Sequence, residues 1–180
     1  MADTKKLELW ETEPDKFDFG AHGLKCAARR GPCKQWCGYV AVPKEHPLHG
    51  YNYSVSRKIS KPAVAQVWDT SGEDREWTYG LYSEEFDCGF LSPEAVFRVH
   101  GGLTYSGDKC PTNDPDGNWW FGFDCAHAGD FIPYDGAVRD LVSRHDGDIY
   151  RDLTFVIAQC EHLAKQLIDY AAAAPPVDKE

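Results

Sequence analysis

The amino-acid sequence predicts an α+β fold in which a twisted antiparallel sheet packs against a long C-terminal helix. Aromatic residues make up 13% of the chain and accompany 16 glycines and 11 prolines, which is typical of strands joined by turns. Residues 119–125 alternate between aromatic and smaller side chains, as a half-buried strand does. Helical periodicity is strong only near the C-terminus. The length of 180 residues fits one domain.

The N-terminal part of the chain predicts an arm followed by a hairpin. Residues 1–20 carry Pro14 and apolar residues scattered among acids, so we expect a loosely attached arm before a single α+β domain at 21–173. Residues 24–29 and 36–42 are predicted strands, because each is an apolar run and a Gly-Pro pair separates them.

The next segments are loops or have no clear pattern. Residues 43–50 contain two prolines and a glycine, which prevent a continuous helix or strand. Residues 51–80 are polar and predict no definite element.

Two central segments are predicted to pair as antiparallel strands. Residues 95–106 alternate well enough for a strand, and the Gly101-Gly102 pair marks a bulge or a close approach to the backbone. A loop at 107–118, rich in Asp, Pro, Gly and Asn, leads to the second strand at 119–125.

The last predicted element is a helix from about residue 152 to about residue 173. Its apolar residues recur at intervals of three and four, which places them on one face. They are Leu153, Val156, Cys160, Leu163, Leu167 and Tyr170. Asp148 or Asp152 is positioned to cap the start of the helix. Residues 174–180 contain a Pro-Pro pair and charges, so we expect a flexible tail.

The charge of the chain argues against polyanionic partners. With 29 acidic and 19 basic residues the net charge is −10, so nucleic acid and anionic membranes should be repelled. A small anion remains compatible if a few arginines converge; the candidates are Arg98, Arg139, Arg144 and Arg151. The N-terminus has no apolar signal core, and no window is apolar enough to cross a membrane. We therefore expect a cytoplasmic protein whose seven cysteines are reduced thiols.

The two central segments also hold the strongest concentration of reactive side chains. These are His100, Thr104, Ser106, Asp124, His127 and Asp130. Imidazoles and carboxylates transfer protons near neutral pH or ligate divalent metals, so together they predict a site. The alternative is that they form only structural hydrogen bonds, as most buried polar groups do.

Two other groups of residues are weaker candidates. Cys26, Cys33, Cys37 and His22 would suggest zinc, but the Cys-x6-Cys-x3-Cys spacing departs from the usual short paired gaps, which favours plain thiols. His46 and His49 lie in the Pro-rich loop and could close over a ligand, although exposed loop histidines are common.

Several motifs resemble a known family. They are Cys37-Gly-Tyr-Val40, His46-Pro-Leu-His-Gly50, His100-Gly-Gly-Leu-Thr-Tyr-Ser106, Trp120-Phe-Gly-Phe-Asp-Cys-Ala-His127 and Tyr150-Arg-Asp152. Together they resemble small uncharacterised proteins encoded by tailed bacteriophages and prophages. The resemblance covers roughly residues 37–167. It implies an accessory, counter-defence role inside the host cytoplasm, for which nucleotide signals are a sensible target, but it assigns no chemistry to the site.

The expected function is to bind and sequester a phosphate-containing, nucleotide-derived small molecule in a pocket lined by His and Asp. Thr104, Ser106, Trp120, Arg98 and Arg151 are the expected ligand-binding residues. One alternative is a hydrolase of cyclic nucleotides or related phosphodiesters. In it the catalytic residues are His100, His127 and Asp124, or a divalent metal is held by Asp124, His127 and Asp130. A second alternative is an acidic protein-interaction module.

Overall fold

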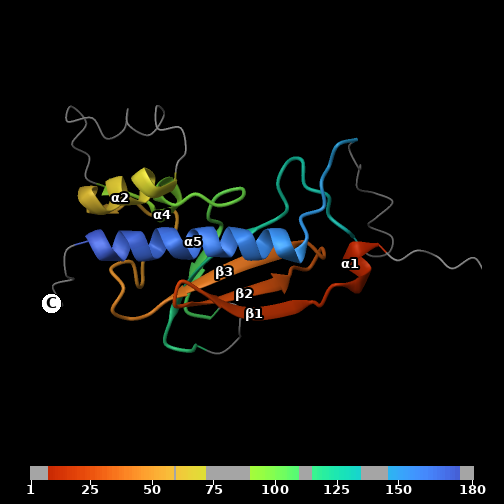
Figure 1. Cartoon of the computed structure of the whole chain (residues 1–180), viewed down its shortest axis with the longest axis horizontal. Helices are drawn as coiled ribbons and strands as arrows, with labels where there is room; N and C mark the ends of the chain where they lie inside the picture. The colour runs from red at the N-terminus through yellow and green to blue at the C-terminus, as the bar shows by residue number, and fades with distance from the viewer. Residues whose placement is uncertain (1–7, 59, 72–89, 110–114, 135–145, 175–180) are drawn as a thin grey trace, which may run out of the picture.

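The protein has an α+β fold of two main layers, a five-stranded antiparallel sheet and a long C-terminal helix (Figure 1). The computed structural model describes residues 8–58, 60–71, 90–109, 115–134 and 146–174. The sheet order is β1-β2-β3-β7-β6. Its strands are β1 (Lys16–Ala21), β2 (Leu24–Arg30), β3 (Trp36–Val42), β7 (Trp119–Asp124) and β6 (Tyr105–Gly107). The predicted fold class is confirmed.

The first three strands form a meander whose turns are set by local backbone conformation. β1 and β2 are joined by His22 and Gly23, which have φ angles of 50° and 81°. Two consecutive residues with positive φ make the tight hairpin turn whose twist matches that of the strands. β2 and β3 pair antiparallel from Cys26↔Val40 to Arg30↔Trp36, so the predicted hairpin is confirmed.

β7 is the strand that connects this meander to the rest of the sheet. It pairs with β3 from Cys37↔Asp124 to Val42↔Trp119 and with β6 on its other side. Phe121 and Phe123 are buried in the main core, whereas Trp120 belongs to a separate small cluster on the opposite face. The predicted alternation along this strand is therefore confirmed.

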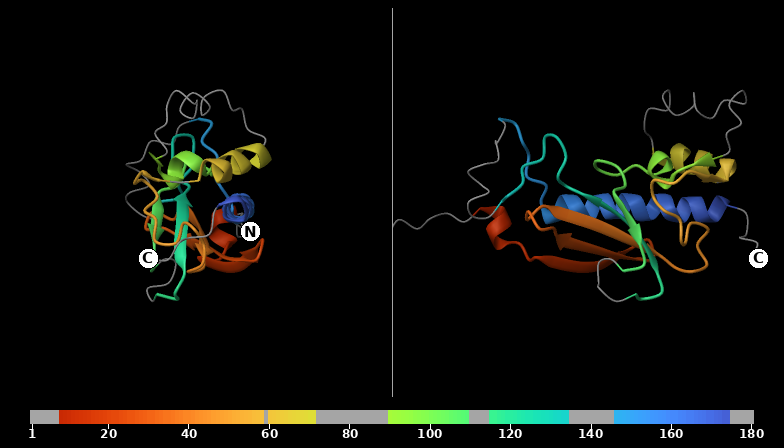
Figure 2. Two further views of the ribbon diagram at one scale, coloured as in Figure 1. Left: turned by 90° about the vertical axis from the view of Figure 1, so that its left-hand side faces the viewer. Right: turned by 180° about the vertical axis from the view of Figure 1, so that it is seen from behind.

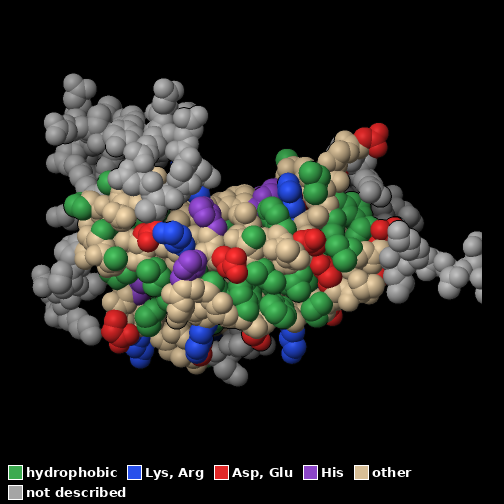
Figure 3. Space-filling model, in the orientation of Figure 1, with side chains coloured by type: hydrophobic (Ala, Val, Ile, Leu, Met, Phe, Trp, Pro, Cys, Tyr) green, Lys and Arg blue, Asp and Glu red, His purple; other side chains and the backbone are tan. Residues whose placement is uncertain are grey.

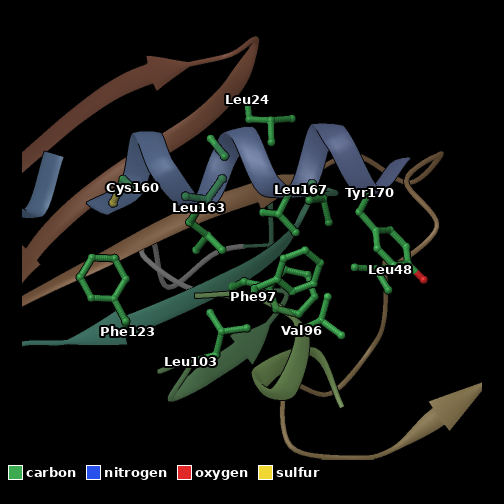
Figure 4. Packing of buried hydrophobic residues seen from close by; sticks show 14 of the residues in the cluster. Leu24, Leu48, Val96, Phe97, Leu103, Phe123, Cys160, Leu163, Leu167 and Tyr170 are labelled. Atoms are coloured by element: carbon green, nitrogen blue, oxygen red, sulfur yellow. The ribbon is translucent and has the colours of Figure 1, made fainter. Parts of the chain in front are cut away.

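The long helix α5 (Leu153–Ala173) packs on the inner face of β1, β2 and β3 (Figure 1). The Asp152 side chain caps it by accepting a hydrogen bond from the Phe155 amide at 2.7 Å. In Figure 4, Leu163, Leu167 and Tyr170 of α5 lie among Val96, Phe97, Leu103 and other core residues. The apolar face predicted from the sequence is thus the face that forms the core. Within the described residues, no helix is long and apolar enough to span a membrane.

Two further helices and a two-stranded sheet lie beyond the main sheet and α5. They are α2 (Lys61–Ser71), α4 (Pro93–Val96), β4 (Arg57–Lys58) and β5 (Phe90–Leu91). α2 packs against α5, and Figure 2 shows α2 and α4 together near the C-terminal end of α5. The sequence pattern of residues 51–80 did not predict α2, because its polar residues obscure the apolar stripe of Ala63, Val64 and Val67.

The expectation of a loose N-terminal arm is wrong for residues 8–20. This segment contains α1 (Leu9–Thr12) and most of β1, and Glu13 between them is anchored in the fold. The Glu13 carboxylate accepts hydrogen bonds from the Leu153 amide at 2.8 Å, from Trp36 Nε1 at 3.1 Å and from the Tyr150 hydroxyl. Arg30 pairs with it at 2.7 Å. The long-range partners of one carboxylate cannot be seen in local sequence. Residues 175–180 of the expected tail lie outside the described part.

The predicted strand at residues 95–106 is also wrong over most of its length. The segment begins in α4, continues without regular structure, turns at Gly101 and Gly102, and becomes β6 only at Tyr105. The two glycines have φ angles of 68° and 85°, which an extended strand of L-residues does not adopt. The reversal places His100 at a turn.

Candidate functional site

The candidate site is centred on Asp130, whose side chain is fully buried. One carboxylate oxygen lies 2.7 Å from His100 Nε2 and also accepts the His127 amide at 3.0 Å. The other oxygen lies 2.8 Å from Arg151 Nε. Three groups from separate segments thus converge on a single carboxylate. The structure brings together the predicted residues His100, His127, Asp130 and Arg151.

His127 forms the second half of the site with Asp124 and Thr104. Its Nε2 lies 3.6 Å from Asp124 Oδ1, too far for a hydrogen bond, and it has no hydrogen-bond partner. Thr104 Oγ1 donates to the other Asp124 oxygen at 2.9 Å. The ring centroids of His100 and His127 are 5.6 Å apart, with an angle of 73° between the ring planes. Each imidazole therefore has a carboxylate beside it. The two imidazoles are also close enough together to contact one small ligand at the same time.

Three features of the backbone build this arrangement. The chain after β7 turns back on itself, with the Asp130 amide bonded to the His127 carbonyl at 3.0 Å. A parallel bridge between Asp130 and Ile149 then holds this turn beside the start of α5. At Gly101 a β-carbon would lie only 1.9 Å from His127 Nε2, so the absence of a side chain there makes room for the ring. The predicted close approach at the glycine pair is confirmed for Gly101.

The side of the site formed by α5 is cationic and aromatic. The Arg151 guanidinium lies over the Phe155 ring, 4.8 Å from its centroid, and the edge of His100 packs on the same ring at 5.2 Å. Because Arg151 Nε is used by Asp130, its terminal nitrogens retain N–H groups for a ligand. The side chains of His100, His127 and Arg151 remain 17%, 31% and 25% exposed. In Figure 3, histidine and Lys or Arg side chains lie next to one another along the upper edge of the molecule.

The hydrogen bonds to Asp130 determine its charge. Burial by itself raises the pKa of this carboxyl, but hydrogen bonds from His100, Arg151 and the His127 amide outweigh it. The pKa of Asp130 is therefore lower than the ordinary value, and the group is an anion at neutral pH. An ionised carboxylate only accepts hydrogen bonds, so His100 must carry its proton on Nε2.

Two predicted ligand-binding residues, Ser106 and Trp120, lie away from this cluster. A third, Arg98, lies near it and forms hydrogen bonds through its main chain. Ser106 Oγ accepts a hydrogen bond from the Tyr53 amide at 2.9 Å, so it supports a neighbouring loop. Trp120 is on the opposite face of the sheet and only 5% exposed, which leaves no ring face for a base. Arg98 is two residues from His100, and its main-chain N–H and C=O bond to Gln166. Arg139 and Arg144 lie outside the described residues.

The predicted metal site is not formed. No group of three or more His, Cys, Asp or Glu side chains in the described part of the chain is arranged to hold a metal ion. Asp130 directs both oxygens toward His100 and Arg151, whereas Asp124 bonds Thr104 and the Ala126 amide at 3.0 Å. The three-residue spacing of Asp124, His127 and Asp130 predicted that they would bind one metal ion together. In the structure the turn directs the two carboxylates toward different partners.

The described cysteines are free thiols, and three of them, Cys26, Cys125 and Cys160, are buried. Cys26 lies in the core, where burial raises its pKa to about 11, and His22 is a hairpin-turn residue. In the described part of the chain, Cys26, Cys33 and Cys37 belong to no group of three or more side chains that could hold a metal ion. Cys125, beside the site, is 3% exposed, and burial is the main cause that raises its pKa to about 12. A thiol with so high a pKa is a poor nucleophile.

The histidine loop at residues 43–50 has a structural role at His46. Its Nε2 lies 3.0 Å from the Leu167 carbonyl, and its Nδ1 accepts the Leu48 amide at 3.1 Å. Burial lowers the pKa of His46, which favours the neutral ring. His49 packs near Trp119, with ring centroids 6.0 Å apart. The pair is therefore not the exposed loop histidines of the alternative interpretation, because His46 is buried and the Nε2 of His49 is buried without a hydrogen-bond partner among the described residues.

Sequence reasoning missed two residues that complete the site, Phe155 and Gln159. Gln159 Oε1 accepts the His100 amide at 2.8 Å, and Phe155 supports both His100 and Arg151. Both lie beside the predicted apolar stripe of α5, one turn apart. The only sequence signal for Phe155 and Gln159 was that they follow the motif Tyr150-Arg-Asp152. The local sequence does not indicate that the first turns of α5 contact residue 100.

No protein-family model, no curated protein and no solved structure matches this chain.

Proposed function

We propose that the protein binds a phosphate-containing, nucleotide-derived small molecule at the cluster of His100, His127 and Arg151, and sequesters it. The observation that carries the proposal is the buried Asp130, which holds His100 and Arg151 at 2.7 and 2.8 Å while their outer edges stay partly exposed. Side chains fixed in this way lose little conformational entropy on binding a ligand. Arginine and imidazole N–H groups are common donors to phosphate oxygens.

The charge balance of the site makes a further demand on such a ligand. Arg151 supplies one positive charge against the carboxylates of Asp124 and Asp130. A phosphate bound here must therefore be held by hydrogen bonds from Arg151 and the imidazoles that outweigh its repulsion by the two carboxylates. The resemblance to phage-encoded proteins supports a ligand drawn from nucleotide signals and an action in the host cytoplasm.

Hydrolysis is the second candidate, favoured by the contact between His100 and Asp130. A histidine that donates one ring N–H to a buried carboxylate has a fixed tautomer and leaves its other nitrogen as a base. With His127 5.6 Å away, one imidazole would accept a proton from the attacking oxygen and the other would protonate the leaving oxygen. The water oxygen bonds to phosphorus as the P–O bond to the leaving oxygen breaks, and the neutral and the protonated imidazole exchange protonation states, so the step requires no metal ion.

The test is to incubate the purified protein with cyclic AMP, cyclic GMP, cyclic di-AMP, cyclic di-GMP and ADP-ribose, and to analyse each mixture before and after heat denaturation. Intact nucleotide that disappears from solution and returns on heating supports sequestration. Products that remain after heating support hydrolysis. If the panel shows neither, the nucleotide proposal is wrong and the acidic interaction module becomes the better reading.

Arg151→Met provides the matched variant, with Lys165→Met as its control. Lys165 lies on α5, the helix that follows Arg151, and pairs with Asp169 at 2.7 Å on an exposed surface, so its removal also deletes one positive charge. Loss of a charge-assisted contact should weaken nucleotide binding about tenfold or more in Arg151→Met. Equal weakening in both variants would show that only the overall charge matters.

A further inference from the structure

Residues 97–100 belong to no strand, and their backbone is bonded to α5. The Arg98 amide donates to Gln166 Oε1 at 2.8 Å, and Gln166 Nε2 donates back to the Arg98 carbonyl at 2.7 Å. The His100 amide donates to Gln159 Oε1 at 2.8 Å. Two glutamine side chains of one helix thus satisfy alternate residues of this segment, as a neighbouring strand would.

The spacing of the two glutamines suits this role. Seven residues make about two helical turns, so Gln159 and Gln166 lie on one face of α5, about 10 Å apart along its axis. Arg98 and His100 are about 7 Å apart in an extended chain, with their N–H groups on the same side. The long, flexible glutamine side chains bridge the difference between these two spacings.

Burial shows that Gln166 is not there for packing alone. It is only 2% exposed and lies between the apolar core residues Leu163 and Leu167 on the helix. A buried amide is costly unless its donors and acceptor are paired, and an apolar side chain would fill the space without that cost. The reciprocal pair of bonds with Arg98 supplies the partners. This arrangement is specific to an amide, because it needs a donor and an acceptor on one side chain.

We propose that Gln159 and Gln166 form a clamp that positions His100 against Asp130. The clamp sets the main chain at residues 98 and 100, and the imidazole is then confined between Asp130 at 2.7 Å and the Phe155 ring at 5.2 Å. Both glutamines act through His100 and are positioning residues. The effect that we expect from the glutamines on ligand affinity rests on the proposed function. Their effect on the position and tautomer of the His100 imidazole does not depend on it.

The two positions respond differently to the same change, which makes the test sharp. Gln159 is used only as an acceptor of the His100 amide, so Gln159→Glu retains that bond whereas Gln159→Met loses it. Gln166 both accepts and donates, so Gln166→Glu and Gln166→Met each lose the bond to the Arg98 carbonyl. Glu161→Met, at an exposed position of α5, is the control for adding a methionine to this helix.

The direct readout is the side-chain nitrogen spectrum of His100 in protein labelled with ¹⁵N-histidine, assigned through His100→Gln. Wild type, Glu161→Met and Gln159→Glu should show the Nε2–H form of His100. Gln159→Met should show a mixture of the two neutral forms. A glutamine with a purely structural role would lower stability without changing this spectrum. If Gln166 variants fail to fold, the Gln159 pair still decides.

The second readout is the affinity for inorganic pyrophosphate, followed by the histidine resonances. Gln159→Met should weaken binding about fivefold to tenfold, the value of one hydrogen bond, whereas Gln159→Glu is compared only in the nitrogen spectrum because its added negative charge also repels pyrophosphate. If pyrophosphate leaves the wild-type spectrum unchanged, the phosphate proposal fails but the tautomer readout still judges the clamp. If pyrophosphate binds and Gln159→Met leaves the His100 signal as in wild type, the clamp is wrong.

Discussion

At the scale of single residues, the site depends on one carboxylate and one missing side chain. Asp130 is fully buried and orients His100 and Arg151. Residue 101 needs to be glycine because His127 Nε2 occupies the place where a β-carbon would be. The neighbouring Gly102 has the same kind of backbone conformation but open space beside it. Alanine substitutions at the two glycines can therefore separate the cost of backbone strain, which both positions share, from a steric clash, which arises only at Gly101.

Gly101→Ala should disturb the site, whereas Gly102→Ala should only strain the backbone. The φ angles of 68° and 85° cost an alanine about 1 kcal/mol at either position. At Gly101 the new β-carbon, 1.9 Å from His127 Nε2, must also displace that ring. Denaturant unfolding should show a larger loss for Gly101→Ala, and the His127 resonances should shift only in that variant. Equal losses with unchanged His127 signals would contradict the proposed contact.

At the scale of elements, the first strand and the last helix are tied together by Glu13. Its carboxylate accepts the Leu153 amide at the first turn of α5, where a negative charge is favoured by the helix dipole. It also pairs with Arg30, and the two side chains are only 10% and 5% exposed. Arg151 of the candidate site lies two residues before α5, so the bond between Glu13 and the Leu153 amide also holds the backbone next to that site.

Glu13→Gln should destabilise the fold by about 2–4 kcal/mol, because it leaves the buried Arg30 guanidinium without its counterion. Urea unfolding followed by tryptophan fluorescence measures the loss, since Trp36 donates to the same carboxylate. Glu161→Gln removes a carboxylate from the exposed face of α5 and should change stability by less than about 0.5 kcal/mol. A Glu13→Gln value as small as that of the control would show that α1 and β1 are loosely attached after all.

At the scale of the whole molecule, the fold carries a net charge of −10, yet the carboxylates of Glu13 and Asp130 are internal. Burial raises the pKa of both Glu13 and Asp130, but their hydrogen bonds and cationic partners outweigh it and leave both pKa values below the ordinary range. A carboxyl whose pKa is lower in the folded state than in the unfolded state stabilises the fold above the unfolded pKa. This stabilisation is lost as the pH falls through the folded pKa.

Asp130→Asn should therefore reduce the pH dependence of stability in acid. At pH 7 the variant should be less stable than wild type by about 2 kcal/mol, because His100 and Arg151 lose a charged partner but remain partly solvated. Below about pH 4, where an unfolded Asp takes up its proton, the difference should shrink. Urea unfolding between about pH 3 and pH 7 measures it. A difference that stays constant over this range would show that Asp130 is not the ionised partner.

Much of the fold was predictable, because its elements have strong local patterns. The apolar stripe and capping Asp152 predicted α5, and aromatic alternation predicted β7. β1 could have been found from Phe17-Asp-Phe19 and the turn at Gly23, had the charged residues before it not suggested an arm. The strand predicted at 95–106 failed because alternation does not reveal two consecutive positive φ angles.

The candidate site divides in the same way between sequence and structure. Residue type was enough to identify the proton donors, acceptors and charges, including His100, His127 and Asp130. Their partners became known only from the folded chain, because they lie 30 residues apart for His100 and Asp130 and 140 apart for Glu13 and Leu153. Periodicity reports which face of an element is buried, but it contains no information about which distant segment packs on that face.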